Sequence, residues 1–454
     1  MDAWSSYDRI VLKMTLEKRI SRDRRLALQS AFLVANTFIW YFLAITIVRD
    51  IITNLNTSFQ QELLLWGIHF GTLVISLIGG VLLVNKLGRR NLFVLWTLIG
   101  VISPIALLAL DVAQTPVTVL VCVIFGVSAG LGMPNSMEYF KRSTNAANRG
   151  RYGGLVMLVS GLGFFVLGTV ASGLVLSAFV LIAWRLFGLI GLLVAKPFAE
   201  HNEKSVAVSY RSILSRRSFI LYIVPWLMFS LVNYLSNPIE YSIVGESTLV
   251  SLNIIGNAIL GVSAIAAGFL MDYVGRKPAA IAGFVLLGLS YAVLGIYPQE
   301  IVSWYFYTIL YGMAWGIFIV LFIVSIWGDL SQDAPSDRFY AIGVLPFFIS
   351  QFLGYAFSYA SINISPYALF SFIAFFLFLA ILPLVYAPET LPEKVMKDRD
   401  LKSYVENAKK KARKEPGKVH KKEKPQNMQA KEKAQETENP TEYEDAVKLA
   451  EKYY

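Results

Sequence analysis

The chain has almost no residues of the kinds that bind metals or form disulfides. Its only cysteine is Cys122, and its three histidines, His69, His201 and His420, are far apart in the sequence. A single thiol cannot form an internal disulfide, and no Cys/His cluster with metal-ligand spacing can be drawn. We therefore expect no bound metal and no cofactor.

The loops that hold nucleotides are also missing. The sequence has no soluble domain and no Gly-rich loop ending in Lys-Ser or Lys-Thr, the motif that cradles phosphates. An enzyme embedded in a membrane would need a nucleophile, a base or a metal at one membrane depth, and no such set can be assembled. We expect a protein that is not an enzyme and hydrolyses no ATP.

Charge is scarce along most of the chain. Only 16% of the residues are charged, 56% are hydrophobic, and the mean hydropathy is +0.55. This composition is too apolar for a soluble globular domain, and continuous apolar runs of about 20 residues cross a bilayer as helices. We predict an all-α membrane protein with twelve spans, at residues 26–48, 63–85, 91–110, 116–137, 152–175, 179–198, 218–238, 249–271, 278–297, 301–328, 339–361 and 365–386.

The positive charges lie on one side of the predicted spans. If the N-terminus is cytoplasmic, 22 Lys and Arg fall on the inner side. The outer side then holds only Arg49, and also Arg185 if the sixth span starts at that residue. Such an asymmetry predicts both termini in the cytoplasm of a multi-pass plasma-membrane protein. The net charge of +10 then indicates attraction to an anionic inner leaflet, not to nucleic acid.

A short charged motif occurs twice. G-x-x-x-D-x-x-G-R-K stands at 268–277, and the degraded copy V-x-x-x-N-x-x-G-R-R stands at 81–90. The acidic residues Glu138 and Asp329, which end the fourth and tenth predicted spans, keep nearly the same offset. Landmarks in register indicate two parallel repeats. We predict bundles at 26–198 and 218–386, joined by a linker at 199–217, after an N-terminal segment at 1–25.

These features resemble the major facilitator superfamily of secondary transporters over the whole membrane region. The sugar-porter and organic-ion branch is the most similar, through the two Gly-Arg turns, Trp184-Arg185 and Pro388-Glu389-Thr390. The resemblance implies twelve helices in two pseudo-symmetric six-helix bundles that rock around a central site. The first motif has Asn85 in place of its aspartate, and the sugar-porter signatures of spans one, five and ten are missing.

The resemblance also implies latches that hold the inner helix ends together in one state. Gly88 and Gly275 permit tight bends, after which Arg89 is expected to pair with Glu138 and Arg276 with Asp329. Asp272 ends a helix and needs a partner such as Arg276 or the start of span eleven. The simpler interpretation is that the arginines only set the topology. The predicted latch residues are Asn85, Gly88, Arg89, Glu138, Arg149, Asp272, Gly275, Arg276, Asp329 and Arg338.

Few ionisable side chains fall within the predicted spans. His69 is a candidate for ion coupling, because a histidine has an intrinsic pKa near neutral, but a hydrogen bond between helices is the favoured explanation. Glu240, near the outer face, is the other candidate. Arg185 is expected at the outer interface, where its side chain can reach water; a deep Arg185 would instead suggest an anionic substrate. Gly154, Gly161 and Gly168 recur every seven residues and suggest close helix packing.

Polar and aromatic side chains near the middle of the spans are the candidates for solute binding. Ordinary contacts between helices are the alternative explanation for each of them taken singly. The predicted set is Asn36, Trp40, Tyr41, Asn233, Tyr234, Asn237, Asn257, Tyr311, Trp315 and Gln351.

The chain ends in a tail of different composition. Residues 387–454 are rich in Lys and Glu and poor in apolar side chains, so we expect a basic, mostly disordered cytoplasmic segment, with a short amphipathic helix at 440–454. The predicted function is secondary transport of a small polar solute, a sugar or an organic ion, by a monomer in the lipid bilayer. The alternative is a transporter-like sensor or scaffold that signals through this tail.

Overall fold

The computed structural model describes residues 2–198, 208–357, 364–392, 396–397, 401 and 404–405, with side chains from residue 21 onward except at 238, 241 and 246. The chain divides into two compact units, residues 1–396 and 397–454. Every regular element within the described residues of the first unit is a helix, as the long apolar runs predict.

The first half of the chain supplies six spans. Within the described residues, eleven helices are long and apolar enough to cross a membrane, and these are the first six of them. Two are interrupted, at Ser103-Pro104 and at Leu131-Gly132. The elements are α1 (Asp2–Asn54), α2 (Phe59–Leu87), α3 (Arg89–Ile102) with α4 (Ile105–Ala109), α5 (Thr115–Gly130) with α6 (Met133–Ser143), α7 (Arg149–Val170) and α8 (Gly173–Ala195).

The second half supplies five long spans and one short one. The tenth span contains a π-helical segment, η1. The elements are α9 (Tyr210–Leu214), α10 (Arg217–Val232), α11 (Asn237–Val244), α12 (Glu246–Tyr273), α13 (Arg276–Ile296), α14 (Ile301–Phe318), η1 (Ile319–Ser325), α15 (Ile326–Leu330), α16 (Asp337–Gly343), α17 (Leu345–Phe357), α18 (Pro366–Leu379) and α19 (Ile381–Tyr386).

The short seventh span has a local cause. Its helix α10 has 16 residues and stops at Val232, and a turn at residues 233–236 separates it from α11. Position 238 is a proline, which lacks the N–H that a continuous helix would use and disfavours helical geometry just before it. The prediction of one span over 218–238 therefore becomes a helix, a turn and a second short helix.

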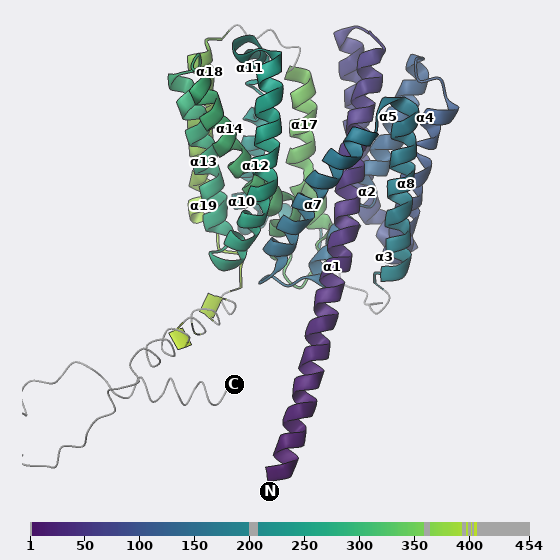
Figure 1. Ribbon diagram of the computed structural model, residues 1–454, viewed down its shortest axis with the longest axis vertical. Helices are drawn as coiled ribbons and strands as arrows, with labels where there is room; N and C mark the ends of the chain where they lie inside the picture. Colours follow the sequence, from purple (N-terminus) through teal and green to yellow (C-terminus); the bar gives the residue numbers. More distant parts are fainter. Residues whose placement is uncertain are drawn as a thin grey trace, which may run out of the picture. The chain divides into compact units, whose positions relative to one another are not determined.

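The helices form two groups, one from each half of the chain (Figure 1). In the first group α2 packs on α5, and α1 packs on α7 and α8. In the second, α12 packs on α14, and α13 packs on α14 and α18. The groups meet where α7 crosses α12, where α2 lies against α17 and where α6 lies against α16. The predicted fold class of two helical bundles is confirmed.

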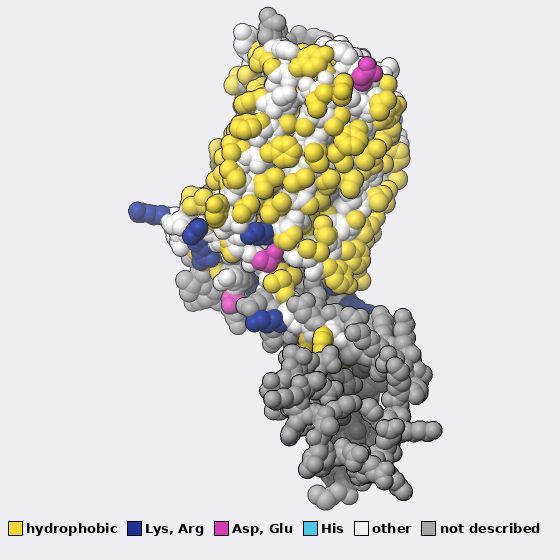
Figure 2. Space-filling view, turned by 90° about the vertical axis from the view of Figure 1, so that its left-hand side faces the viewer, with side chains coloured by type: hydrophobic (Ala, Val, Ile, Leu, Met, Phe, Trp, Pro, Cys, Tyr) yellow, Lys and Arg dark blue, Asp and Glu magenta, His cyan; other side chains and the backbone are white. Residues whose placement is uncertain are grey.

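The outer surface of the bundles is apolar. Figure 2 shows hydrophobic side chains over one whole face, with Lys and Arg gathered near its lower edge. Large side chains such as Val302 and Phe375 are 73% and 65% exposed. An apolar face this continuous is unfavourable in water, whereas the acyl chains of a bilayer would cover it.

Two predicted boundaries shift. The helix α1 runs without a break through the expected boundary at 25/26. At the other end, Ala387 and Leu391 are buried at 3% and 2% exposure, so packing against the bundle continues to Leu391, within the segment expected as a tail. The linker residues 199–207 and the helix expected at 440–454 lie outside the described residues.

Candidate functional site

A cavity of about 230 Å³ lies within the second half of the chain. It is enclosed by the turn after α10 and by α11, α12 and α14. The described residues that line it are Asn233, Tyr234, Asn237, Glu240, Leu249, Leu252, Asn253, Gly256, Asn257, Leu260, Trp304, Tyr307, Thr308, Tyr311 and Gly312. Four amides, one carboxylate and four aromatic rings therefore face a single space.

Hydroxyl groups connect the cavity to the packed interior. The hydroxyl of Ser236 donates to Glu240 at 2.5 Å, and its oxygen lies 3.3 Å from the hydroxyl of Tyr291. Tyr307 donates to Tyr291 at 3.2 Å. Glu240 thus stands at one end of a row of hydrogen bonds that continues through the hydroxyls of Ser236, Tyr291 and Tyr307. Glu240 itself lines the cavity.

Half of the predicted solute-binding residues line this cavity, and they all come from the second half of the chain. They are Asn233, Tyr234, Asn237, Asn257 and Tyr311. Gln351 lies just behind the wall, where its Nε2 donates to the hydroxyl of Tyr234 at 2.9 Å. Trp315 is buried against Phe229 and does not line the cavity.

The three predicted residues of α1 contribute nothing to the cavity. Asn36 donates to the carbonyl of Trp184 at 2.8 Å, and Trp40 stacks on Phe125. Tyr41 lies against Phe348 of α17, with ring centroids 5.8 Å apart. Together with the stacked pair Trp66 and Tyr355, at 3.7 Å, this contact fills the space between the halves. The cavity described above lies in the second half and includes none of these residues.

Ion pairs join the two halves at one end of the helices. We call this the arginine-rich end, because Arg89, Arg149 and Arg276 all lie there. Asp329 of α15 accepts hydrogen bonds from Arg149 of α7 and from the Nε of Arg276, the latter at 2.8 Å. The expected contact between Arg276 and Asp329 is present, and Arg149 extends it to the other half of the chain.

Asp272 completes this network. It pairs with Arg276 at 3.0 Å and accepts the backbone N–H groups of Gly150 and Arg151, each at 2.9 Å. Those N–H groups open α7, so the carboxylate that ends α12 caps the start of a helix in the other half, where the helix dipole favours it. The sequence suggested Arg276 or the start of span eleven as the partner of Asp272. Arg276 is a partner, but the helix start that Asp272 caps is that of span five.

Arg89 and Glu138 lie near enough for their charges to interact, but each forms its direct salt bridge with another residue. Arg89 pairs with Asp337 at 3.0 Å, whereas Glu138 pairs with Arg142 one helical turn away at 2.6 Å. Glu138 also accepts the backbone N–H of Ser336 at 2.7 Å. Arg89 thus joins the first half to α16 through Asp337, and Glu138 joins it to the residue before α16 through Ser336.

The remaining latch candidates have smaller roles. Gly88 and Gly275 have φ values of 78° and 120°, which a side chain would strain, so the two tight bends are as expected. Asn85 is exposed. Arg338 donates to the carbonyl of Val208 at 2.9 Å, and no ion pair of Arg338 is found among the described residues.

Glu389 is a structural residue that the sequence analysis did not identify. Its carboxylate accepts the backbone N–H groups of Arg276 at 2.8 Å and Lys277 at 3.1 Å, the first residues of α13. The motif Pro388-Glu389-Thr390 was the available signal. Its acidic residue caps the helix whose first residue, Arg276, holds Asp329.

The two coupling candidates lie in different environments. Glu240 lines the cavity, as described above. His69 is buried between α2 and α5, where its Nδ1 lies 3.2 Å from the carbonyl oxygen of Cys122 and its ring packs on Trp66 and Phe70. The geometry at His69 is that of a contact between helices.

Arg185 lies deep in the first bundle, not at the interface. It is 1% exposed, near the middle of α8, and its guanidinium lies 4.4 Å from the ring centroid of Trp96. It also donates to Asn36 and Thr37, both at 3.3 Å. The span starts at Gly173, earlier than predicted, which places Arg185 at mid-depth. It does not line the cavity.

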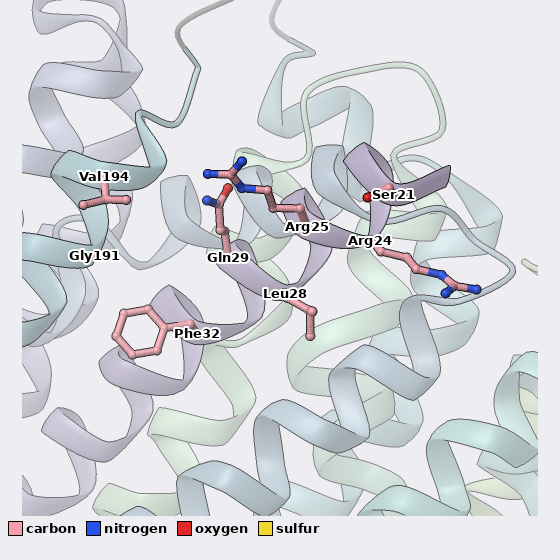
Figure 3. Close-up of a pocket in the computed structure, with 8 residues that line it drawn as sticks. All are labelled: Ser21, Arg24, Arg25, Leu28, Gln29, Phe32, Gly191 and Val194. Atoms are coloured by element: carbon pink, nitrogen blue, oxygen red, sulfur yellow. The ribbon is translucent and has the colours of Figure 1, made fainter. Parts of the chain in front are cut away.

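A groove on the outside of the first bundle is apolar and shallow. Phe32 of α1 and Gly191 and Val194 of α8 form its floor, and Arg25 extends over it whereas Arg24 points away (Figure 3). It lies on the outer surface of the first bundle and shares no residue with the cavity.

Comparison with known proteins decides the family. Residues 30–326 match the family model described as Major Facilitator Superfamily, which covers more than half of the chain. The chain belongs to the Major Facilitator Superfamily. The resemblance seen in the two Gly-Arg turns is thereby confirmed, and the protein is of a transporter family, not an enzyme.

Solved structures of superfamily members share the fold. The proton:xylose symporter XylE bound to 6-bromo-6-deoxy-D-glucose is 16% identical, with a TM-score of 0.58 over 82% of this chain and 97% of that one. The human organic anion transporter MFSD10 (TETRAN) is 13% identical, with a TM-score of 0.61 over 80% and 99%. No curated protein sequence matches significantly. At such identities the likeness establishes the superfamily fold alone.

Proposed function

We propose that this protein is a secondary transporter that carries a small polar solute across the plasma membrane by alternating access, as a monomer. Both termini and the arginine-rich end face the cytoplasm in this proposal. The bundles rock against each other, and the network around Asp329 closes the inner side in one of the two states.

The observation that carries the proposal is the concentration of inter-half ion pairs at a single end of the helices. Arg149 and Arg151 of the first half pair with Asp329 and Asp272 of the second half, whereas Arg276 pairs with both aspartates within the second half. Asp272, Asp329, Arg149 and Arg276 are each at most 8% exposed. Separation of the halves would therefore leave the buried charge of Arg149 without its carboxylate and expose the network to water. In this proposal the network has two stable states. In one, all its ion pairs are formed and water is excluded; in the other, the pairs between the halves are broken and the charges are hydrated, as alternating access requires.

The cavity supports solute binding. Pockets for small molecules combine apolar walls with a few placed polar groups, and the wall from Asn233 to Gly312 has this character. The structural neighbours include a proton:xylose symporter and an organic anion transporter. Proteins with this fold therefore transport neutral solutes as well as charged ones.

Reconstitution tests the proposal. The purified full chain is placed in liposomes, and uptake of labelled sugars, organic anions and organic cations is compared with protein-free liposomes. We expect uptake of at least one class, and a change in its rate in the variant Asp272→Asn. A folded protein that takes up none of them would contradict transport and favour the sensor alternative.

A further inference from the structure

We propose that the cavity binds a small organic cation, with Glu240 as its counter-charge. This inference rests on the proposed transport function and names the class of solute. It follows from the charge of the cavity wall, the aromatic rings around it and one unpaired amide.

The charge of the wall is of one sign. Glu240 is the only acidic residue among the described residues that line the cavity, and no Lys, Arg or His is among them. In the described part of the chain, Glu240 forms no salt bridge, and it accepts a hydrogen bond from the neutral hydroxyl of Ser236. A carboxylate at such a place is costly unless a positive charge compensates it, and a cationic solute would supply that charge.

The buried arginines of the protein are engaged elsewhere. Arg149 and Arg276 belong to the network at the arginine-rich end, where two aspartates balance them. Arg185 lies in the first bundle between Trp40 and Trp96. None of the three lines the cavity, so Glu240 has no protein cation beside it among the described residues that line the cavity.

The aromatic residues suit a cation as well. Tyr234, Trp304, Tyr307 and Tyr311 line the cavity, and their polar atoms are largely used inside the protein. Trp304 donates to the carbonyl of Pro298 at 2.8 Å, and Tyr311 donates to Asn233 at 3.3 Å. What remains for a solute is mainly the rings, which attract organic cations through their electron-rich faces.

One polar group lacks a partner. The side chain of Asn233 is 2% exposed, and its Nδ2 finds no hydrogen bond of acceptable geometry among the described residues. An unpaired buried donor is unfavourable, and a solute oxygen would satisfy it. The expected solute is therefore an amine or quaternary ammonium compound that also carries a hydroxyl or carbonyl oxygen.

Three molecules of nearly equal shape and different charge test this inference. Choline is a cation, 3,3-dimethylbutan-1-ol is its neutral analogue and 3,3-dimethylbutanoate is an anion. Each is added to the purified full chain, and thermal unfolding reports binding because a ligand of the folded state raises the midpoint. Uptake of the same three into proteoliposomes is measured in parallel.

We expect choline to stabilise the protein more than either analogue. Glu240→Gln should weaken choline binding at least tenfold, whereas Glu300→Gln, at an exposed acidic residue that does not line the cavity, should leave it unchanged. Tyr311→Phe should retain more binding than Tyr311→Leu, because only the first keeps an aromatic ring. If Glu240→Gln does not fold, the relative stabilisation of the unaltered protein by the three compounds still tests the inference.

The failures of the two proposals differ. Equal or better binding and uptake of the alcohol or the anion would overturn the cation inference while leaving transport intact. Choline binding that Glu240→Gln does not reduce would also overturn it. Uptake of none of the wider panel of sugars, anions and cations would instead contradict the transport function itself.

Discussion

Asp329 accepts a hydrogen bond from Arg149, a residue 180 positions earlier in the other half of the chain. The same carboxylate binds Arg276, which in turn binds Asp272. Arg151, whose side chain is 41% exposed, also pairs with Asp272, so two aspartates and three arginines form one network. Because a buried charge without a partner is strongly destabilising, the network holds the halves together only when it is complete.

The pair formed by Arg89 and Asp337 should show energetic coupling. Both side chains are largely buried, at 15% and 8% exposure. In a double-mutant cycle with alanine we expect a coupling free energy of about 1 kcal/mol. The same cycle between Arg89 and Glu138 should give less, since Arg142 and Ser336 hold Glu138. Urea or thermal unfolding of the four variants measures both, and the reverse order would refute the assigned partners.

Gly154 and Gly161 offer a matched test of the contact between α7 and α12. A Cβ at Gly154 would lie 2.5 Å from the carbonyl oxygen of Ala264, whereas one at Gly161 would meet nothing within 4 Å. Gly154→Ala should force the helices apart and cost about 2 kcal/mol of stability. Gly161→Ala should be neutral or slightly stabilising, because alanine favours helix.

The two alanine variants also separate packing from helix propensity. Their thermal unfolding midpoints should move in opposite directions or differ clearly. Equal effects would mean that α7 and α12 do not approach each other at Gly154. Of the three glycines spaced by seven, only Gly154 then supports close packing, since Gly168 also has open space beside it.

Arg185 should be replaceable by a long apolar side chain. It contacts aromatic rings and two neutral oxygens, and it pairs with no carboxylate among the described residues. Arg185→Met should fold with similar stability, because replacing a buried charge with a packed apolar group is often neutral. Arg185→Ala should lose about 2 kcal/mol through the cavity it leaves. Loss of solute uptake in a stable Arg185→Met protein would place Arg185 in the transport site.

Truncation of the tail should depend sharply on its position. Removing residues 393–454 leaves Glu389 on the start of α13, so transport should persist. Removing 387–454 deletes this cap together with the buried Leu391, and Glu389→Ala alone should cost about 1 kcal/mol. Solute uptake and the thermal unfolding midpoint are measured for the two truncated proteins and for Glu389→Ala. Equal uptake and equal midpoints for the two truncations would rule out a role for the cap.

The sequence predicted the parts of this structure that depend on local pattern. Apolar runs located the spans to within a few residues, and the repeated Gly-Arg turns located the arginine-rich end. The contact of Arg276 with Asp329 followed from the family resemblance. The break in the seventh span was not among these predictions, although the proline at position 238 was a signal for it, since proline acts on the backbone beside it.

Contacts between distant elements could not be derived in this way. The partner of Arg89 depends on whether Arg142 reaches Glu138 first, and the sequence does not settle that competition. The three aromatic and amide residues of α1 have the right character for a solute site, yet packing against α8 and α17 uses them. The depth of Arg185 in its span could have been predicted from the sequence. It lies only 11 positions before Lys196 at the end of its helix, about half the thickness of a bilayer.

The central claim is that the buried network closes the arginine-rich end in one of two states. Double electron–electron resonance tests it, with spin labels on cysteines at Arg90 and Tyr273 in a Cys122→Ser background. We expect a single short distance in the otherwise unaltered protein and a second, longer distance when Asp329→Asn is added, since removing the partner shared by Arg149 and Arg276 costs about 3 kcal/mol. Asp50→Asn, at an exposed pair, should change nothing. Identical distance distributions with and without Asp329→Asn would contradict the account.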